Sequence, residues 1–359
     1  MPSIHTKTAR RQKRARVSPD GLGMNIGVLR FDRTAALIDG RVQIENVNVI
    51  NVPGGKTGVQ GLLSGGLEGA DVPFIKYVLW KAAGKPITAI PVFTDRLFQH
   101  QYIYTRSDTG IKSLSDLRGR RVICAPSYFS TPTFWTRALI EEAGVPISSI
   151  EWYSAGKPDN GVAYPEALNV KVAPASWLGL ERLIDGTADC LITARTARIS
   201  AGWEGRIRRV LDDAYKKDRA WAKRTGHFPP LHVFAINKNA LAARPTFPRE
   251  LCAAFDAAKA YGYRILQDER MNGLPFMRGY LDDTVEFFGD DPWPYGVQKN
   301  REQIERFLNL VHQQGATERL IGFDELFDND AVDFQFTARM TPGCITGVMD
   351  GGWAPIRTL

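Results

Sequence analysis

Short apolar runs alternate with amphipathic segments along the chain from Met24 onward. Apolar or alternating runs predict strands, whereas apolar positions three or four residues apart predict helices. The predicted strands are Asn25–Arg30, Val47–Val52, Ala70–Phe74, Ile87–Phe93, Val122–Ala125, Asp189–Thr193 and His232–Asn237. The predicted helices are Val59–Leu67, Ile75–Ala83, Thr133–Ala143, Trp177–Gly186, Asp213–Arg224, Arg249–Gln267 and Lys299–Gln314. This alternation predicts an α/β fold with mostly parallel strands covered by helices.

The formal net charge of +7 is concentrated at the N-terminus. Residues 1–23 hold six basic side chains against Asp20 alone, so the rest of the chain carries only +2. We interpret residues 1–23 as a basic disordered tail before a nearly neutral body, which disfavours a nucleic-acid partner. The pair Arg10-Arg11 is not followed by the apolar stretch of an export signal, so a cytoplasmic location is expected.

Composition narrows the class of protein further. The chain is 44% hydrophobic and 24% charged, as in ordinary globular proteins, and its length suggests about two domains. No apolar run approaches the ~20 residues that cross a bilayer, which argues against a membrane partner. The cysteines are widely spaced, which disfavours a disulfide scaffold or a cysteine-based zinc module. Segment 54–58, GGKTG, has the wrong spacing for a phosphate loop and is interpreted as a flexible turn.

Three predicted strand ends carry an arginine, at Arg33, Arg96 and Arg195. Ligands of α/β sheets bind beyond the carboxyl ends of the strands, and guanidinium groups pair well with carboxylates. The loop after Ala125 contains small hydroxyl residues and leads into a helix, an arrangement that attracts anions. Each arginine alone is better explained as an exposed or structural ion pair. Together they predict a site for a small dianion.

Four segments, in order, resemble the 4,5-dihydroxyphthalate decarboxylase family. Segment 31–42, FDRTAALIDGRV, resembles "YDRTxxLxDGRV", and segment 89–100, AIPVFTDRLFQH, resembles "AIPVFxxRxFRH". Segment 225–232, TGHFPPLH, resembles "TGxFPxxH", and segment 289–301, GDDPWPYGVQKNR, resembles "GDDxWPYGxxxNR". The likeness extends over nearly the whole predicted folded part.

The resemblance implies a two-lobed fold like that of type II periplasmic solute-binding proteins, with the ligand in a cleft between the lobes. Residues 24–102 plus 232–359 would form one lobe and residues 103–231 the other. Two segments depart from the family pattern. The loop 126–132 lacks the glutamate of "PEYQMTA", and segment 69–77 lacks "SxSSY". Both departures lie near the implied cleft and leave the substrate open.

The implied reaction is non-oxidative removal of CO2 from a hydroxylated phthalate. It requires a base for the phenol, an acid for the ring carbon and cations for the second carboxylate. His232 and His100 are the best acid–base candidates, because imidazole titrates near neutral pH. Each fits a structural histidine equally well, and which one is acid and which is base is left open. His227 is a third choice.

The remaining candidates would bind the substrate. Arg33, Arg96 and Arg195 would anchor its carboxylates, and Ser127 and Thr131 would supply donors at the helix start. Trp293 and Tyr295 would stack on the ring or donate a hydrogen bond to the substrate, although WPYG fits a structural turn equally well. No cofactor is expected. A divalent metal on His100, His232 and a carboxylate is the weaker alternative, because no close HxH or HxxxH spacing occurs.

The expected partner is thus a small aromatic dicarboxylate, and homo-oligomerisation is left open. The leading hypothesis is a decarboxylase that converts 4,5-dihydroxyphthalate to protocatechuate in aromatic catabolism. The alternatives are a non-catalytic solute-binding protein of a transporter and a decarboxylase of another hydroxylated aromatic acid.

Overall fold

The computed structural model describes residues 23–125, 127–154, 162–174, 177, 179–340 and 356–357. The predicted tail, apart from Gly23, and Cys344 lie outside these ranges. The other cysteines, Cys124, Cys190 and Cys252, are buried and free. No helix in the described ranges is both long and apolar enough to cross a membrane.

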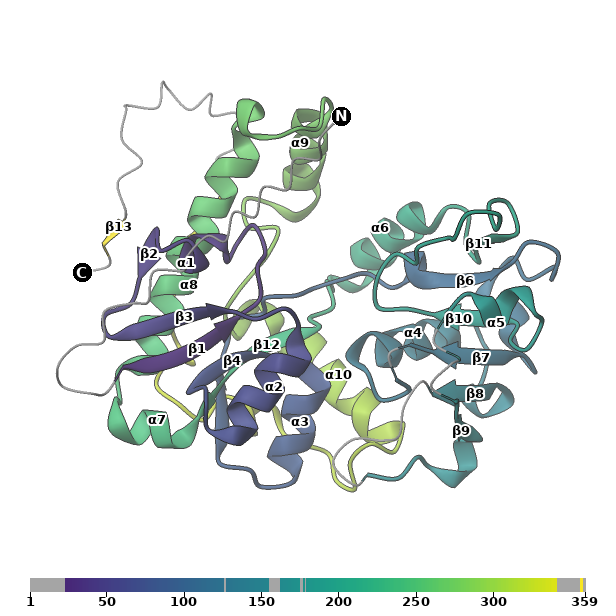
Figure 1. The fold of residues 1–359 in the computed structure, drawn as a ribbon, viewed down its shortest axis with the longest axis horizontal. Helices are drawn as coiled ribbons and strands as arrows, with labels where there is room; N and C mark the ends of the chain where they lie inside the picture. The colour runs from purple at the N-terminus through teal and green to yellow at the C-terminus, as the bar shows by residue number, and fades with distance from the viewer. Residues whose placement is uncertain are drawn as a thin grey trace, which may run out of the picture.

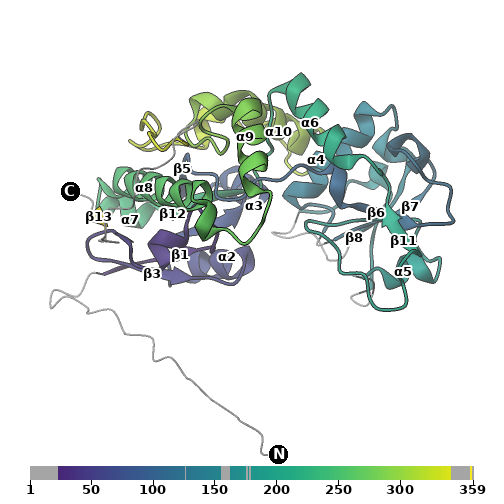
Figure 2. The same ribbon diagram turned by 90° about the horizontal axis from the view of Figure 1, so that it is seen from above.

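Two α/β lobes lie side by side, each built on its own sheet (Figures 1 and 2), which confirms the predicted two-lobed α/β fold. The sheet of lobe 1 has the order β3-β1-β4-β12-β5; β1 is parallel to β3 and β4, and β12 is antiparallel to β4 and β5. Its strands are β1 (Met24–Val28), β3 (Val47–Asn51), β4 (Gly69–Pro73), β5 (Ile87–Ile90) and β12 (His232–Asn237). The helices beside it are α1 (Ala35–Ile38), α2 (Gly55–Ser64), α3 (Phe74–Ala82), α7 (Lys238–Ala243), α8 (Phe247–Gln267), α9 (Met277–Phe288) and α10 (Arg301–Gln313).

The sheet of lobe 2 has the order β11-β6-β10-β7-β8-β9, in which β6 is antiparallel to both of its neighbours. Its strands are β6 (Ile103–Arg106), β7 (Arg121–Cys124), β8 (Glu151–Ser154), β9 (Val170–Val172), β10 (Cys190–Ile192) and β11 (Ile207–Arg209). Its helices are α4 (Thr131–Glu142), α5 (Glu181–Ile184) and α6 (Ala214–Thr225). A separate parallel pair joins β2 (Val42–Gln43) to β13 (Ile356–Arg357). Short 3₁₀ helices occupy His100–Tyr102, Leu114–Leu117, Ile147–Ser149, Glu166–Leu168, Glu269–Met271, Gln298–Asn300 and Phe323–Glu325.

An aromatic cluster at α10 joins the two lobes. Phe307 of α10 stacks on Phe74 of lobe 1, with ring centroids 5.2 Å apart, and on Trp135 of lobe 2, at 5.7 Å. Phe134 contacts the same ring edge-on at 5.9 Å. All four side chains are buried, and Figure 2 shows α10 and α4 side by side between the lobes. Burying four aromatic rings contributes several kcal/mol, so the lobes share one core at this end.

The glycines of α2 let this helix lie directly on the strands below it. Gly55 and Gly58 leave room for the imidazole of His232 and for the main chain of Asp71, respectively. A Cβ atom at Gly55 would lie 2.9 Å from Cε1 of His232. Segment 54–58 was predicted to be a flexible turn, and this prediction is wrong, because Gly55 begins α2. The glycines serve close packing against β4 rather than a loop.

Candidate functional site

The main chain of residues 91–96, after β5, binds two of the predicted site residues, Arg33 and His232. The carbonyl oxygen of Thr94 accepts hydrogen bonds from Nε of Arg33, at 2.8 Å, and from its Nη2. The next carbonyl, that of Asp95, accepts the backbone N–H groups of Leu231 at 2.7 Å and His232 at 3.3 Å. Arg33 and the start of β12 are therefore fixed to neighbouring residues at one edge of the lobe 1 sheet.

The guanidinium of Arg33 lies between two aromatic rings. Its Cζ atom is 3.6 Å from the ring centroid of Trp293 and 4.2 Å from that of Phe31. Nη1 donates to Asp32 at 2.9 Å, and 10% of the Arg33 side chain stays exposed. Stacking and hydrogen bonding on several sides leave the guanidinium little freedom to rotate.

Trp293 is held from behind by a buried polar cluster. Its indole N–H donates to the carbonyl of Phe93 at 2.8 Å, and its backbone N–H donates to Oη of Tyr263 at 3.1 Å. Its carbonyl accepts from Nζ of Lys259 at 3.2 Å. Lys259 and Tyr263 both bind Asp291 at 2.9 Å. The buried Lys259–Asp291 pair thus places the ring that lies against Arg33.

His232 begins β12 and is partly exposed, whereas its Nδ1 atom is buried without a hydrogen-bond partner. Burial lowers the pKa of His232 below its ordinary value of 6.5, Arg195 lowers it further, and Asp95 opposes both. The imidazole is therefore neutral at pH 7. A neutral imidazole can accept a proton, which suits a general base.

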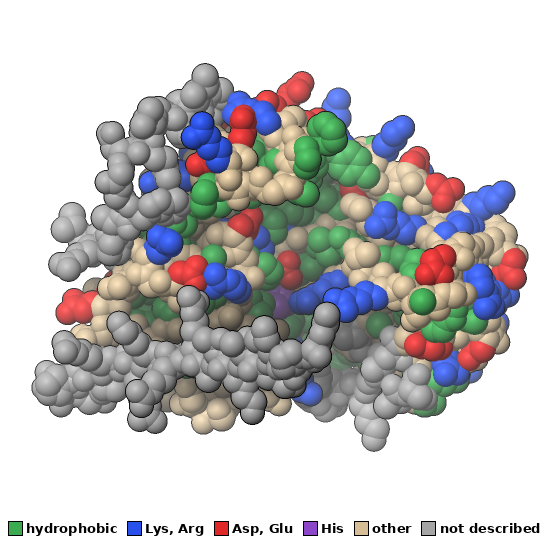
Figure 3. All heavy atoms as spheres, turned by 45° about the horizontal axis from the view of Figure 1, so that its top comes forward, with side chains coloured by type: hydrophobic (Ala, Val, Ile, Leu, Met, Phe, Trp, Pro, Cys, Tyr) green, Lys and Arg blue, Asp and Glu red, His purple; other side chains and the backbone are tan. Residues whose placement is uncertain are grey.

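Arg195 approaches His232 from the other lobe. It is exposed, it follows β10 of lobe 2, and its charge acts on the imidazole of lobe 1. Figure 3 shows a histidine and basic side chains gathered in the hollow between the lobes. The structure thus brings together Arg33 and His232 on one side of the cleft and Arg195 on the other.

Arg96 and Tyr295 do not reach the surface of this cleft. Arg96 is 1% exposed, and it donates to the carbonyls of Phe228 at 2.6 Å and Pro294 at 2.8 Å and to Asn300 at 2.5 Å. Burial lowers its pKa to about 9. Tyr295 is buried in the lobe 1 core under Nζ of Lys259, 4.5 Å from the ring centroid. The predicted contacts of Arg96 and Tyr295 with substrate are corrected to structural roles in lobe 1.

His100 is also placed in the interior. It is 7% exposed, and its Nδ1 lies 2.7 Å from Oδ1 of Asp218, which also accepts from Gln101. The cavity beside it holds about 10 Å³, far below the several hundred Å³ of ordinary ligand sites. The prediction that His100 exchanges protons with a substrate is therefore corrected to a buried His–Asp pair.

The loop before α4 is only partly open. Thr131 is buried, and its hydroxyl accepts the backbone N–H of Ile75 from lobe 1 at 3.2 Å. Thr133 and Ser130 satisfy each other as the helix cap. Of the two hydroxyl residues predicted to bind substrate, Ser127 is partly exposed and Thr131 is not. Pro126, next to Ser127, lies outside the described residues. Thr131 therefore joins the lobes and does not face a ligand.

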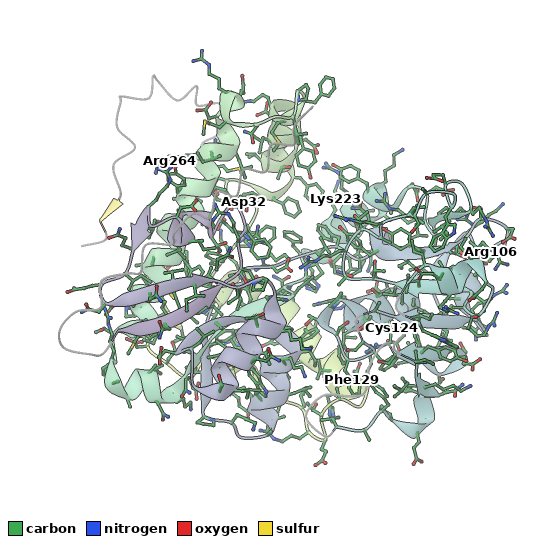
Figure 4. All side chains as sticks on the ribbon, viewed as in Figure 1. Asp32, Arg106, Cys124, Phe129, Lys223 and Arg264 are labelled. Atoms are coloured by element: carbon green, nitrogen blue, oxygen red, sulfur yellow. The ribbon has the colours of Figure 1, made fainter. Side chains whose placement is uncertain are left out.

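A groove of about 820 Å³ lies between α6 and α9, which face each other across the lobes (Figure 1). Figure 4 labels Lys223, which lines the groove from α6. A row of rings leads from the groove to the arginine site: Phe288 lies 5.8 Å from Phe228, and Phe228 lies 5.2 Å from Trp293. The volume is within the range of small-molecule sites. The groove is lined by Arg219, Ala220, Ala222, Lys223, Gly226, Asp283, Glu286, Phe287 and Phe288.

Three residues beside the site, Asp71, Thr94 and Asp95, were not predicted from the sequence. Asp71 is fully buried, and desolvation raises its pKa from 3.8 to about 7, although hydrogen bonds from Thr94 and Leu29 oppose this. Asp95 raises the pKa of Asp71 further, and Arg33 lowers it. The signal in the sequence was an isolated aspartate in the apolar strand 70–74, because a carboxylate in a buried strand is rare.

We expect the raised pKa of Asp71 to make folding stability depend on pH. Between about pH 4 and pH 7 the folded protein keeps a proton that the unfolded chain has released, so stability falls as pH rises and is level above pH 7. The free energy of unfolding of Asp71→Asn minus that of wild type should therefore rise by about 3 kcal/mol from pH 5 to pH 8. Urea unfolding of both proteins across this range measures the difference, and a constant difference would contradict the expectation.

Within the described ranges, no group of three or more His, Cys, Asp or Glu residues could hold a metal ion. No family model matches the sequence. The chain is 30% identical over 318 residues to a 4,5-dihydroxyphthalate decarboxylase of Comamonas testosteroni, which covers 85% of this chain and 96% of that one. The chain belongs to the 4,5-dihydroxyphthalate decarboxylase family.

A second member of this family, from Pseudomonas putida, is 31% identical over 184 residues, which covers 48% of this chain and 71% of the other. Among solved structures, the aliphatic sulphonate-binding protein SsuA of Escherichia coli has a TM-score of 0.50 at 14% identity, and the alignment covers 85% of this chain and 96% of SsuA. Protein AF1704 of Archaeoglobus fulgidus also has a TM-score of 0.50, at 13% identity, and the alignment covers 81% of this chain and 98% of AF1704. These likenesses show the solute-binding-protein fold of this decarboxylase family member.

Proposed function

We propose that the protein converts 4,5-dihydroxyphthalate to protocatechuate and CO2. The family match over 96% of a relative with this name carries the proposal. The geometry supports it, because Arg33 and His232 bind the neighbouring carbonyls of Thr94 and Asp95 on one lobe, and the charge of Arg195 on the other lobe acts on the neutral imidazole. A planar dianion fits two guanidinium groups that approach from different sides.

The chemistry follows from the substrate. Loss of the phenol proton para to the leaving carboxylate pushes electron density onto the carbon that bears it. That carbon gains a proton to give a cyclohexadienone-like intermediate, and breaking its bond to the carboxylate releases CO2 and restores the aromatic ring. Loss of CO2 leaves the phenol oxygen as a phenolate, which takes a proton back. The net change therefore replaces the carboxylate by one proton.

His232 would take the phenol proton, and Arg33 and Arg195 would bind the two carboxylates. Trp293 would line the ring of the substrate, and Ser127 would offer a hydroxyl from lobe 2. A neutral imidazole and preorganised cations need little rearrangement as charge develops. We propose no cofactor or metal for this reaction.

The direct test is a turnover assay with purified protein. We expect 4,5-dihydroxyphthalate to give protocatechuate, followed by chromatography, with the same rate after dialysis against EDTA. Calorimetry runs in parallel. Ligand binding without turnover would favour the solute-binding alternative, which the names of the relatives do not favour, and turnover of a different hydroxylated acid would reassign the substrate.

The cytoplasmic location remains a prediction that cell fractionation tests.

A further inference from the structure

Asp71 is a buried carboxyl whose neighbours are unusual. It lies in β4 with no exposed surface, and in the described part of the chain no Lys or Arg forms an ion pair with it. Its oxygens instead accept the backbone N–H of Leu29 at 2.9 Å and the hydroxyl of Thr94. A carboxyl buried without a cation costs folding free energy, so its place in the core calls for a role other than stability.

Thr94 links this carboxyl to the cleft. Its hydroxyl donates to Asp71, and its carbonyl accepts two hydrogen bonds from one edge of the Arg33 guanidinium. With the contact to Asp32, three of the five N–H groups of Arg33 have partners, and the described residues give none to the other two. The network therefore fixes one edge of Arg33 and leaves donors for a carboxylate.

The main chain of the loop after β1, which carries Arg33, is held from two sides. Asp71 binds Leu29, at the end of β1, and α8 packs against the loop at Gly262. A Cβ atom at Gly262 would lie 2.7 Å from the carbonyl oxygen of Asp32 and 3.1 Å from Cα of Arg33. The backbone of Arg33 thus has no room to shift toward α8.

We propose that Asp71 and Thr94 are positioning residues that fix the guanidinium of Arg33 for binding a substrate carboxylate. This inference rests on the proposed function of the cleft. The bond from the Thr94 hydroxyl to Asp71 holds Thr94 in place, and the main-chain carbonyl of Thr94 then fixes one edge of Arg33. Neither side chain touches the substrate, because both are fully buried.

The test compares Thr94→Val, Thr94→Ser and Asp71→Asn. Thr94→Val keeps the shape and loses the donor, so KM should rise about tenfold or more while kcat changes less than about threefold, because the lost binding is common to ground and transition states. Asp71→Asn cannot accept from both Leu29 and Thr94 through one carbonyl oxygen, and the same split is expected. Thr94→Ser keeps the hydroxyl and should restore a KM near that of wild type.

Thr88→Val is the matched control. Thr88 is equally buried in the same lobe, and its hydroxyl accepts from Asn329 rather than acting on Arg33. Its KM should stay at the wild-type value. Equal KM values for Thr94→Val and Thr88→Val, or no recovery in Thr94→Ser, would overturn the proposal.

A readout without substrate separates this inference from the proposed function. The Nε–H resonance of Arg33, assigned by its loss in Arg33→Lys, should shift and exchange faster with water in Thr94→Val but not in Thr88→Val. Absence of turnover in the wild type would remove the proposed function, and this resonance would still decide the inference. An unchanged resonance in Thr94→Val would overturn it.

Discussion

Replacing His232 with alanine is expected to lower kcat by about 10²-fold or more, the usual range for a general acid or base. The imidazole is neutral near pH 7, because burial and the charge of Arg195 lower its pKa. Without it, the phenol proton must leave to water. Single-turnover formation of protocatechuate measures the loss, and KM should change little, because the imidazole carries no charge for the ground state.

The pH profile identifies His232 more sharply than the loss of rate. In the wild type, kcat/KM should fall below pH 6.5, as the base becomes protonated. Arg195→Met removes a cation that lowers the pKa, so this acid limb should move to higher pH. Asp95→Asn removes an anion that raises it, so the limb should move to lower pH. Shifts of opposite sign are expected only if His232 is the titrating group.

His312→Ala is the control for a histidine outside the cleft. His312 lies on α10, and its Nδ1 is 3.1 Å from the carbonyl of Thr317. Its removal should leave kcat and the acid limb unchanged. If His232→Ala keeps the wild-type rate, His232 has no part in the mechanism and the base must be sought elsewhere in the cleft.

The alternation of strands and helices could be predicted from the sequence, because buried strands such as β4 and β12 are short, largely apolar runs. The two-lobed arrangement was implied by the family resemblance. Helices α7 and α9 and strands β8, β9 and β11 were among the elements missed. Helix α9 exposes Tyr280 and buries only Leu281, so its apolar stripe is weak. Strand β11, at Ile207–Arg209, contains two arginines and is recognisable only through its antiparallel pairing with β6.

The site was predictable at the level of strand ends but not of side-chain direction. Arg33 and Arg96 look alike in sequence, since each follows an aspartate after an apolar run. They differ in the groups that surround them: Arg96 donates to the carbonyls of Phe228 and Pro294, which are far away in the chain. Such long-range contacts are absent from local pattern, and the same holds for the Asp218 partner of His100.

Replacing Arg33 with methionine is expected to lower kcat/KM by about 10²- to 10³-fold, largely through KM. Methionine keeps an apolar stem between Phe31 and Trp293 but cannot neutralise a carboxylate, and an unpaired buried charge costs about 2–5 kcal/mol. Steady-state kinetics of protocatechuate formation measures the loss, and thermal unfolding shows whether the fold is kept.

Arg30→Met removes the same charge from the same loop. Arg30 is exposed and pairs with Asp39 at 2.8 Å, a surface ion pair worth about 1 kcal/mol or less. Its kcat/KM should therefore stay within about threefold of wild type. Equal losses in the two variants would mean that the cleft attracts its ligand through overall charge, and Arg33 would not be an anchor.

Product binding then tells which carboxylate Arg33 holds. Protocatechuate keeps one carboxylate of the proposed substrate. If Arg33 binds the carboxylate that is retained, Arg33→Met should weaken product inhibition as much as it raises KM. If it binds the carboxylate that leaves as CO2, product inhibition should be unchanged, and Arg195 becomes the anchor of the retained group. We expect Arg33 to bind the retained carboxylate. Arg33 lies beside Trp293 on the lobe that carries His232, so a substrate anchored there keeps its ring against Trp293 while the base reaches the phenol.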